Sequence, residues 1–226
     1  MPVNAQYNVA RPDSLPVRVA MHQRRKIFRA FLNASRVAPG DTILDVGVTG
    51  DRSYEHSNYL EAWYPHKDRI TGVGIDDASF LERRYPGLSL VRADGRQLPF
   101  AAGSFDFVHS SAVLEHVGSN RRQTDFLREL WRVARRGIFV TTPNRWFPVE
   151  FHTLLPLAHW LPRRLFRRVL VGIGREFFAA EENLNLLSRR TLDEAARNAG
   201  IPGFRIDCVR LVGWPTNLLL SASNKA

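Results

Sequence analysis

Residues 43–51 decide the fold of this chain, and they read Ile43-Leu44-Asp45-Val46-Gly47-Val48-Thr49-Gly50-Asp51. Apolar residues flank an acid and glycine follows at once, which is how a buried parallel strand ends in a tight turn below a bound ligand. A side chain at Gly47 would stand between the backbone and that ligand, and glycine also permits a positive φ there. A second apolar run, residues 70–75, ends in Asp76 and Asp77. Because an acid at the end of a second strand can accept both hydroxyls of a ribose, the pattern predicts a nucleoside-containing cofactor at the carboxyl ends of a doubly wound sheet.

A dinucleotide is not the favoured cofactor. Its site needs Gly-x-Gly-x-x-Gly, because the backbone must approach a pyrophosphate closely. Counted from Gly47, the second and third glycine positions hold Thr49 and Arg52. Asp76 also lies farther beyond Gly47 than the about 20 residues of the dinucleotide pattern. A nicotinamide-dependent reductase is therefore disfavoured.

The same stretch resembles the glycine-rich loop of class I S-adenosylmethionine-dependent methyltransferases, Asp/Glu-x-Gly-x-Gly-x-Gly. Asp45 and Gly47 match this loop, Thr49 departs from it where glycine is usual, and Gly50 follows one place late. Val-Leu-Glu-His-Val at residues 113–117 is a frequent signature of the small-molecule, type 11-like members of that family. The resemblance covers roughly residues 42–144, and the final hairpin by pattern.

The resemblance implies an α/β fold with a doubly wound, seven-stranded, mostly parallel Rossmann-like sheet, and a helical insertion after the fifth strand. We expect a single methyltransferase domain over residues 1–226. Thr191 and Glu194 predict a capping box for its last helix. The helix over residues 17–35 either covers the cofactor or packs on the sheet. The predicted parts are an N-terminal arm and helix (1–40), a cofactor-binding core (41–144), a helical lid or insertion (145–187), and a C-terminal helix with the closing hairpin (188–226).

Composition limits the compartment and the partners. The chain has 226 residues, which fits one domain with a sizeable core. Its single cysteine, Cys208, allows neither an internal disulfide nor a cysteine metal cluster and suits a reducing compartment. We see no secretory signal and no apolar run of membrane-spanning length, so we expect a cytoplasmic protein. The net charge of +10 is weak evidence for an anionic partner.

One segment raises the question of a membrane surface. In the helix expected from Pro162 to Ile173, apolar residues share one face and basic residues the other. Such a helix can lie on an anionic membrane as a peripheral contact. The alternative is a lid whose basic residues face water, here Arg163, Arg164, Arg167 and Arg168.

By resemblance, the donor is S-adenosylmethionine and the product S-adenosylhomocysteine. The loop at Gly47 would pass under the methionine part, Asp76 would hold the ribose, Asp94 with Gly95 would meet the adenine, and Ser110 would lie near the sulfonium. Asp45 has a structural alternative, as an acid that organises the loop. The full set of expected donor residues is Asp45, Gly47, Val48, Thr49, Gly50, Asp76, Asp77, Asp94, Gly95 and Ser110.

The acceptor side is less specific. Methyl transfer mainly needs the two reactants held close and aligned, so we predict no metal, and a base helps where the acceptor must lose a proton. Glu150 and His152 are two apart and in an extended loop can face one cleft. We therefore predict His152, Glu150 and His116 as catalytic candidates, each with a structural alternative. Asn144 and Trp146 are the expected substrate-binding residues.

The sequence thus predicts a methyltransferase that acts on a small molecule or on a lipid- or glycan-linked intermediate. An RNA or tRNA methyltransferase remains open, because of the net charge. Base-amine methylation is disfavoured, because Ser-Ser-Ala-Val at residues 110–113 stands where Asp/Asn-Pro-Pro-Tyr/Phe is usual. A non-catalytic S-adenosylmethionine-binding module also fits. The sequence identifies neither the acceptor and its methylated atom nor the oligomeric state.

Overall fold

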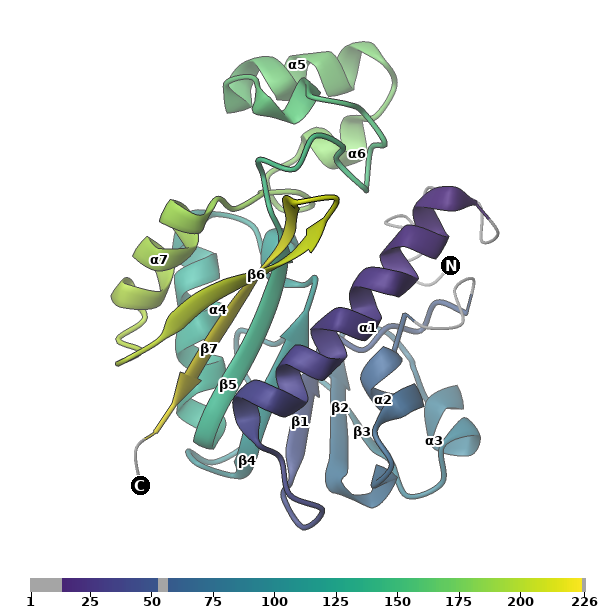
Figure 1. The fold of residues 1–226 in the computed structure, drawn as a ribbon, viewed down its shortest axis with the longest axis vertical. Coiled ribbons are helices and arrows are strands. Elements are labelled where there is room, and N and C mark those ends of the chain that lie inside the picture. The colour runs from purple at the N-terminus through teal and green to yellow at the C-terminus, as the bar shows by residue number, and fades with distance from the viewer. Residues whose placement is uncertain (1–13, 53–56, 225–226) are drawn as a thin grey trace.

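The computed structural model describes residues 14–52 and 57–224, so the first part of the expected N-terminal arm lies outside the described residues. The chain forms a seven-stranded sheet in the order β3-β2-β1-β4-β5-β7-β6. The first five strands of that order run parallel, β7 is antiparallel to β5, and β6 is antiparallel to β7. The predicted fold class is therefore confirmed (Figure 1).

The strands follow the apolar runs of the sequence. All four residues of β1 are buried, as expected for a central parallel strand covered on both faces. β2 and β4 flank β1, so the strand order reverses beside β1 and opens a crevice at the carboxyl ends of these strands. The strands are β1 (Ile43–Val46), β2 (Ile70–Gly74), β3 (Ser89–Arg92), β4 (Phe105–Ser111), β5 (Ala134–Pro143), β6 (Arg205–Leu211) and β7 (Trp214–Ser223).

Helices cover both faces of the sheet. α1 (Leu15–Ser35), α2 (Tyr59–Trp63) and α3 (Phe80–Arg84) lie on one face, and α4 (Asn120–Val133) and α7 (Arg189–Asn198) lie on the other (Figure 1). Each face has its own apolar core, one centred on Phe31 and Phe139 and the other on Phe126 and Leu130. Short 3-10 turns complete the connections at η2 (Lys67–Arg69), η3 (Leu114–His116) and η4 (Ala158–Trp160).

Two local expectations about helices can be compared with the structure. α1 buries Gln23, Ile27 and Phe31, so it packs on the sheet over residues 23–31, and none of its residues before Gln23 is buried. The capping box of α7 joins Ser188 and Thr191, not Thr191 and Glu194. The prediction was wrong by one turn because Ser188 is the residue with extended backbone before the helix, and its hydroxyl accepts from the Thr191 amide.

The segment between β5 and α7 stands beyond the end of the sheet and carries α5 (Arg163–Gly172) and α6 (Glu176–Ala179), both visible at the top of Figure 1. It has a small apolar cluster of its own, made by Phe166, Leu170, Phe178, Leu184 and Leu186. Within residues 14–52 and 57–224, none of the helices combines the length and apolar character that a membrane span requires.

Candidate functional site

A cavity of about 370 Å³ opens at the carboxyl ends of β1, β2 and β4, which is where the strand order predicts a ligand. Its size lies within the range of small-molecule sites, roughly 300–1,000 Å³. Its walls come from the loop after β1, the ends of β2 and β3, the turn after β4, one residue of α1, and two residues each of α4 and the β5–α7 segment.

The glycine loop forms one wall and explains why glycine stands there. Gly47 has a φ of +117°, and a Cβ on it would lie 2.0 Å from Cγ2 of Val113, another cavity residue. The amides of Gly47 and Val48 donate to the carbonyl of Val73 at 2.8 and 3.0 Å, which fixes the turn. A Cβ on Gly50 would lie 2.5 Å from the backbone oxygen of Asp77, so that glycine permits close approach of two loops.

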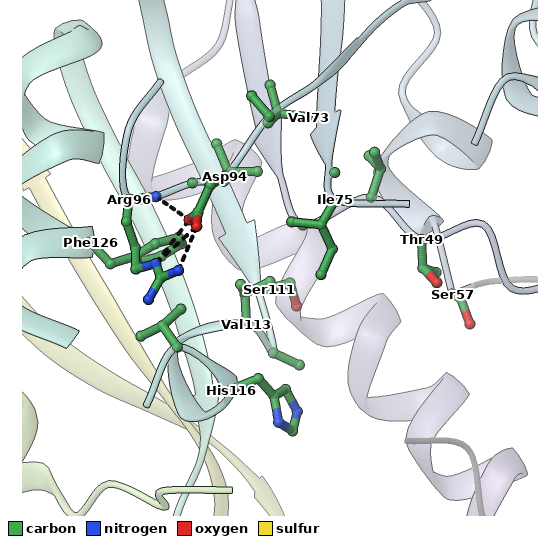
Figure 2. A pocket seen from close by; sticks show the side chains of 18 of the residues that line it. Thr49, Ser57, Val73, Ile75, Asp94, Arg96, Ser111, Val113, His116 and Phe126 are labelled. Atoms are coloured by element: carbon green, nitrogen blue, oxygen red, sulfur yellow. Dashed lines mark hydrogen bonds and ion pairs between the residues drawn. The ribbon is translucent and has the colours of Figure 1, made fainter. Parts of the chain in front are cut away.

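The end of β3 forms the opposite wall. Asp94 and Gly95 line the cavity as expected, and a Cβ on Gly95 would lie 2.5 Å from the ring of Phe126. The guanidinium of Arg96 donates to both carboxylate oxygens of Asp94, with 2.6 Å between Nη2 and Oδ2 (Figure 2). Hydrogen bonds from Arg96 lower the pKa of Asp94, which therefore presents a negative edge to the cavity.

These walls fit the adenosine part of the expected donor. Ile75 is 49% exposed and lines the same cavity as Asp94, so the cavity offers a large apolar side chain as well as that carboxylate. Phe126 and Val73 extend that apolar surface (Figure 2). A flat base with an exocyclic amine would cover the apolar surface, and its amine would donate to the carboxylate.

Five expected donor residues lie in the cavity wall, namely Gly47, Val48, Thr49, Asp94 and Gly95. The other five, Asp45, Gly50, Asp76, Asp77 and Ser110, are not among the described residues that line it. Asp76 is 7% exposed and directly follows the lining residue Ile75 at the end of β2. Its role toward the ribose remains a prediction.

Ser110 and Asp45 are corrected by the geometry of the sheet. Ser110 is fully buried and donates to the carbonyl of Val46 at 2.7 Å, while the next residue, Ser111, lines the cavity. Successive side chains of a strand point to opposite faces, so an error of one residue moves the side chain out of the site. Asp45 is not among the described residues that line the cavity, and its Oδ1 lies 2.7 Å from Nδ1 of His109.

Asp45 thus belongs to a buried polar group under the loop, which supports its structural alternative. Nε2 of His109 lies 2.9 Å from the hydroxyl of Tyr59, and Phe31 packs edge-on against the imidazole. Burial raises the pKa of Asp45 to about 7 and lowers the pKa of His109 to about 4. Burial and the neighbouring Asp45 raise the pKa of Glu61 well above its usual range.

The three catalytic candidates do come together, at the other end of the cavity. His116 and His152 both line it, and their Nε2 atoms are 3.1 Å apart. Oε1 of Glu150 accepts from Nδ1 of His152 at 2.6 Å, and Nδ1 of His116 donates to the carbonyl of Asn183 at 2.6 Å. In Figure 2, Val113 and Ser111 lie between His116 and Asp94, which separates this end from the Asp94 end.

Hydrogen-bond directions indicate how these groups are charged. A carbonyl can only accept, so His116 carries its proton on Nδ1 and presents a lone pair at Nε2. His152 must then donate from Nε2 to His116 as well as from Nδ1 to Glu150, which makes it an imidazolium. The chain of hydrogen bonds therefore places the imidazolium of His152 on the cavity wall, with its charge paired by the carboxylate of Glu150.

The pKa directions agree with that arrangement. Burial opposes the charge on His152, but the carboxylate of Glu150 outweighs it and raises the pKa of His152. Burial also opposes the charge on Glu150, yet His152 and the amides of His152 and Thr153 lower the pKa of Glu150 to about 2. Burial, helped by the charge of His152, lowers the pKa of His116 to about 3.

The predicted substrate-binding residues lie elsewhere. The amide of Asn144 donates to the carbonyl of Pro215 at 3.0 Å, and its oxygen accepts from the Trp146 amide. Trp146 is 48% exposed, contacts Trp160 edge-on, and its carbonyl accepts from Nε1 of Trp214. Both residues tie the loop after β5 to the β6–β7 hairpin, and neither is among the described residues that line the cavity.

The structure also adds residues that the sequence did not suggest. Arg24 of α1, Arg122 of α4 and Glu182 bring charge to the cavity wall. Ala112 has a φ of +56° at the turn after β4, a conformation that non-glycine residues rarely adopt and that clusters at functional sites. Arg24 could have been found from its place on the helix expected to cover the site, whereas the strain at Ala112 leaves no trace in the sequence.

A family model described as a methyltransferase domain matches residues 44–141. A demethylmenaquinone methyltransferase of Roseiflexus sp. (strain RS-1) is 32% identical over 183 residues, which cover 76% of this chain and 66% of that protein. Another demethylmenaquinone methyltransferase, from Beutenbergia cavernae, is 33% identical over 133 residues, which cover 54% of this chain and 50% of that protein. The chain thus spans less than two thirds of the length of these relatives.

Solved structures share the fold at low sequence identity. Magnesium protoporphyrin IX methyltransferase from Synechocystis PCC 6803 with bound S-adenosylhomocysteine superposes with a TM-score of 0.58 at 16% identity, over 97% of this chain and 91% of that chain. A methyltransferase from Aquifex aeolicus gives a TM-score of 0.56 at 16% identity, over 93% and 99% of the two chains. These likenesses support the α/β fold found here.

Proposed function

We propose that the chain is a class I S-adenosylmethionine-dependent methyltransferase and that it transfers a methyl group from S-adenosylmethionine to a small-molecule acceptor. One observation carries this proposal. A cavity at the switch point of the sheet has an adenosine-compatible wall at the Asp94 end and an imidazolium, His152, at the other. A methyl donor and an acceptor need two such ends, close enough for an in-line reaction.

We propose that different residues of the cavity bind different parts of the donor. The loop at Gly47–Thr49 would carry the amino-acid part of the donor, and Ile75, Asp94 and Phe126 the adenine. Asp76 would accept the ribose hydroxyls from the edge of β2. Once bound, the donor supplies a methyl group on a sulfonium, which is reactive enough that orientation provides most of the rate.

The charge on His152 gives the acceptor end a chemical role. Both ring nitrogens of His152 are engaged, Nδ1 with Glu150 and Nε2 with His116. We propose that this imidazolium stabilises the ionised form of an acceptor hydroxyl or acidic carbon, and that Glu150 holds it charged and oriented. As an imidazolium, His152 has no lone pair and cannot accept a proton, so it acts as a general base only after it has given up its Nε2 proton, which modifies the simple base expected from the sequence.

The acceptor class follows from the relatives and from the surface. Two relatives are demethylmenaquinone methyltransferases, which favours a small, oxygen-bearing acceptor over RNA. α5 and its C-cap residue expose Leu165, Val171 and Ile173, which are 45%, 51% and 48% exposed, beside the basic residues of the helix. We propose that a lipid-linked acceptor would be met at this face, with the protein in the cytoplasm and in peripheral contact with an anionic membrane.

Labelled S-adenosylmethionine tests the function directly. The full chain is incubated with labelled donor and with separated small-molecule, lipid, RNA and protein fractions of a cell extract. We expect label in the small-molecule or lipid fraction. Label confined to RNA or protein would overturn the acceptor class, and tight donor binding without transfer to any fraction would favour a non-catalytic binding module.

Cosedimentation with vesicles tests the membrane contact. We expect binding to vesicles rich in anionic lipid at physiological salt, and loss of binding when Arg163, Arg164, Arg167 and Arg168 are changed together to glutamine. Charge-neutral vesicles are the control. Protein that stays in the supernatant with both vesicle types would leave α5 as a lid whose arginines face water.

A further inference from the structure

Three metal-ligating side chains converge at the acceptor end of the cavity. Glu115 and His116 follow each other in η3, and His152 comes from the loop after β5. Their ligand atoms all lie within 4.8 Å of one another. The two Nε2 atoms are 3.1 Å apart, and Oε1 of Glu115 lies 3.8 Å from Nε2 of His116.

The second nitrogen of each histidine is fixed in the way that metal-binding histidines require. Nδ1 of His116 donates to the carbonyl of Asn183, and Nδ1 of His152 donates to the carboxylate of Glu150. Histidine ligands of metals nearly always donate their other N–H to a carbonyl or a carboxylate, which orients the ring and turns the free lone pair toward the ion. Here both Nε2 atoms point at one another across a gap of 3.1 Å.

Glu115 provides an independent observation. It is fully buried, and its Oε2 accepts from the hydroxyl of Thr142 at 2.9 Å. Its Oε1 has no hydrogen-bond partner among the described residues. An unpartnered carboxylate oxygen is expensive to bury, because it has lost its water without a replacement. A cation at this position would remove that cost.

We propose that Glu115, His116 and His152 bind one divalent first-row transition-metal ion, of which Zn²⁺ is the probe of choice. Nitrogen and oxygen ligands lie about 2.0–2.2 Å from such an ion, so tetrahedral neighbours are about 3.3 Å apart. The separations of 3.1 and 3.8 Å need only small side-chain shifts to meet that value. Two histidines and one carboxylate leave at least one coordination position open, and it would face the cavity.

The proposed ion has a place in the chemistry, and this step rests on the proposed methyltransferase function. An acceptor oxygen could occupy the open position, where the ion would favour its ionised form. The positive charge that His152 carries in the absence of an ion would then be supplied by the metal. Glu150 would act as a positioning residue that holds His152 in the ligating orientation.

Calorimetric titration tests the site without donor or acceptor. The full chain is stripped with a chelator, dialysed, and titrated with Zn²⁺. We expect one ion per chain with a dissociation constant below about 1 µM, and Co²⁺ should give visible absorption bands in the same stoichiometry. Glu115→Gln keeps the buried shape and the bond to Thr142, and it should weaken Zn²⁺ binding by at least tenfold, as should His116→Ala and His152→Ala.

His66→Ala is the matched control, because it removes a histidine that lies outside the cluster. It should bind Zn²⁺ like the unchanged chain, and circular dichroism should confirm that all variants are folded. Absence of stoichiometric binding, or binding that survives in folded Glu115→Gln and His152→Ala, would overturn the proposal. S-adenosylhomocysteine titrated into the same samples reports the donor site separately. A chain that binds S-adenosylhomocysteine but no Zn²⁺ loses the metal site and keeps the proposed function.

Discussion

Two histidine–carboxylate pairs of almost equal length occupy this molecule, and they differ in charge. In the pair below the glycine loop, His109 lies 2.7 Å from Asp45, and in the pair at the cavity, His152 lies 2.6 Å from Glu150. Burial keeps charge off the first pair, since it raises the pKa of Asp45 and lowers that of His109. The second pair is also buried, but both Glu150 and His152 are charged.

The neighbours of each carboxylate explain the difference. Glu150 accepts from the backbone amides of His152 and Thr153 as well as from the imidazole, so its negative charge is shared among three donors. Asp45 instead has the carboxyl of Glu61 as a neighbour, and burial disfavours charge on both. A short distance between a histidine and an acid therefore does not identify an ion pair. The hydrogen-bond donors around the acid determine whether the pair is charged. They also distinguish a structural pair from a pair that is able to act on a ligand.

Removal of His109 should break the structural pair, and of the substitutions predicted here it should lower the unfolding free energy the most. His109→Ala leaves a cavity between Phe31 and Phe139 and removes the hydrogen-bond partner of Asp45 and Tyr59. We expect a loss of about 3–5 kcal/mol in unfolding free energy, measured by urea denaturation. S-adenosylhomocysteine affinity of the folded variant should change little. A stable variant with lost affinity would mean that His109 serves the donor site instead.

Asp76→Ala tests a third acid, which we expect to bind the donor, in contrast to Asp45 and Glu150. If Asp76 holds the ribose, the variant should bind S-adenosylhomocysteine more weakly by roughly 1–3 kcal/mol, since two hydroxyls lose a charged acceptor. NADH should not bind either form. Calorimetry that finds unchanged affinity would take Asp76 out of the donor site, and binding of NADH in its place would overturn the identity of the donor.

The pH dependence of Asp45→Asn should sharpen the comparison with a smaller effect. The folded-state pKa of Asp45 is about 7, above its ordinary value of 3.8, so its contribution to stability is complete below pH 3.8 and is lost as pH rises through 7. From pH 6 to pH 8 this loss amounts to about 1 kcal/mol in the unchanged chain. The unfolding free energy of Asp45→Asn, followed by thermal denaturation, should fall less over the same interval, by about the 1 kcal/mol that Asp45 contributes in the unchanged chain. Parallel profiles for the two proteins would mean that Asp45 keeps one protonation state from pH 6 to pH 8, which would contradict a pKa of about 7.

The sequence predicts the donor half of the site better than the acceptor half. Gly47, Asp94 and the apolar strands follow a local pattern, because each is set by the chain within a few residues of itself. Asp45 could not be assigned from such a pattern, because its partner His109 is 64 residues away and meets it only through the pairing of β1 with β4. Ser110 was expected in the cavity, but its neighbour Ser111 lies in the wall instead. Successive side chains of a strand point to opposite faces, so a shift of one residue changes the face.

The acceptor half depends on contacts that no short pattern contains. The spacing of Glu150 and His152 led us to expect both side chains at one cleft, and the structure joins them by a hydrogen bond with only His152 in the cavity lining. His116 meets His152 across 36 residues, which no local spacing indicates. Glu115 stood inside the recognised stretch, and only its burial without a partner for Oε1 marks it as chemically significant. Asn144 and Trp146 were expected at the acceptor because they follow β5, yet the antiparallel hairpin beside β5 engages both.

The rate of methyl transfer by His152→Ala tests the central claim most directly. The claim is that the pair at the cavity acts on the acceptor, while the donor is held elsewhere. With the acceptor fraction found by labelling, we predict a kcat at least tenfold lower than that of the unchanged chain, on the order expected for loss of one catalytic group. S-adenosylhomocysteine affinity should stay within about twofold, since His152 lies away from the donor wall. An unchanged kcat would remove His152 from the chemistry, and a lost donor affinity would contradict the division of the cavity into two ends.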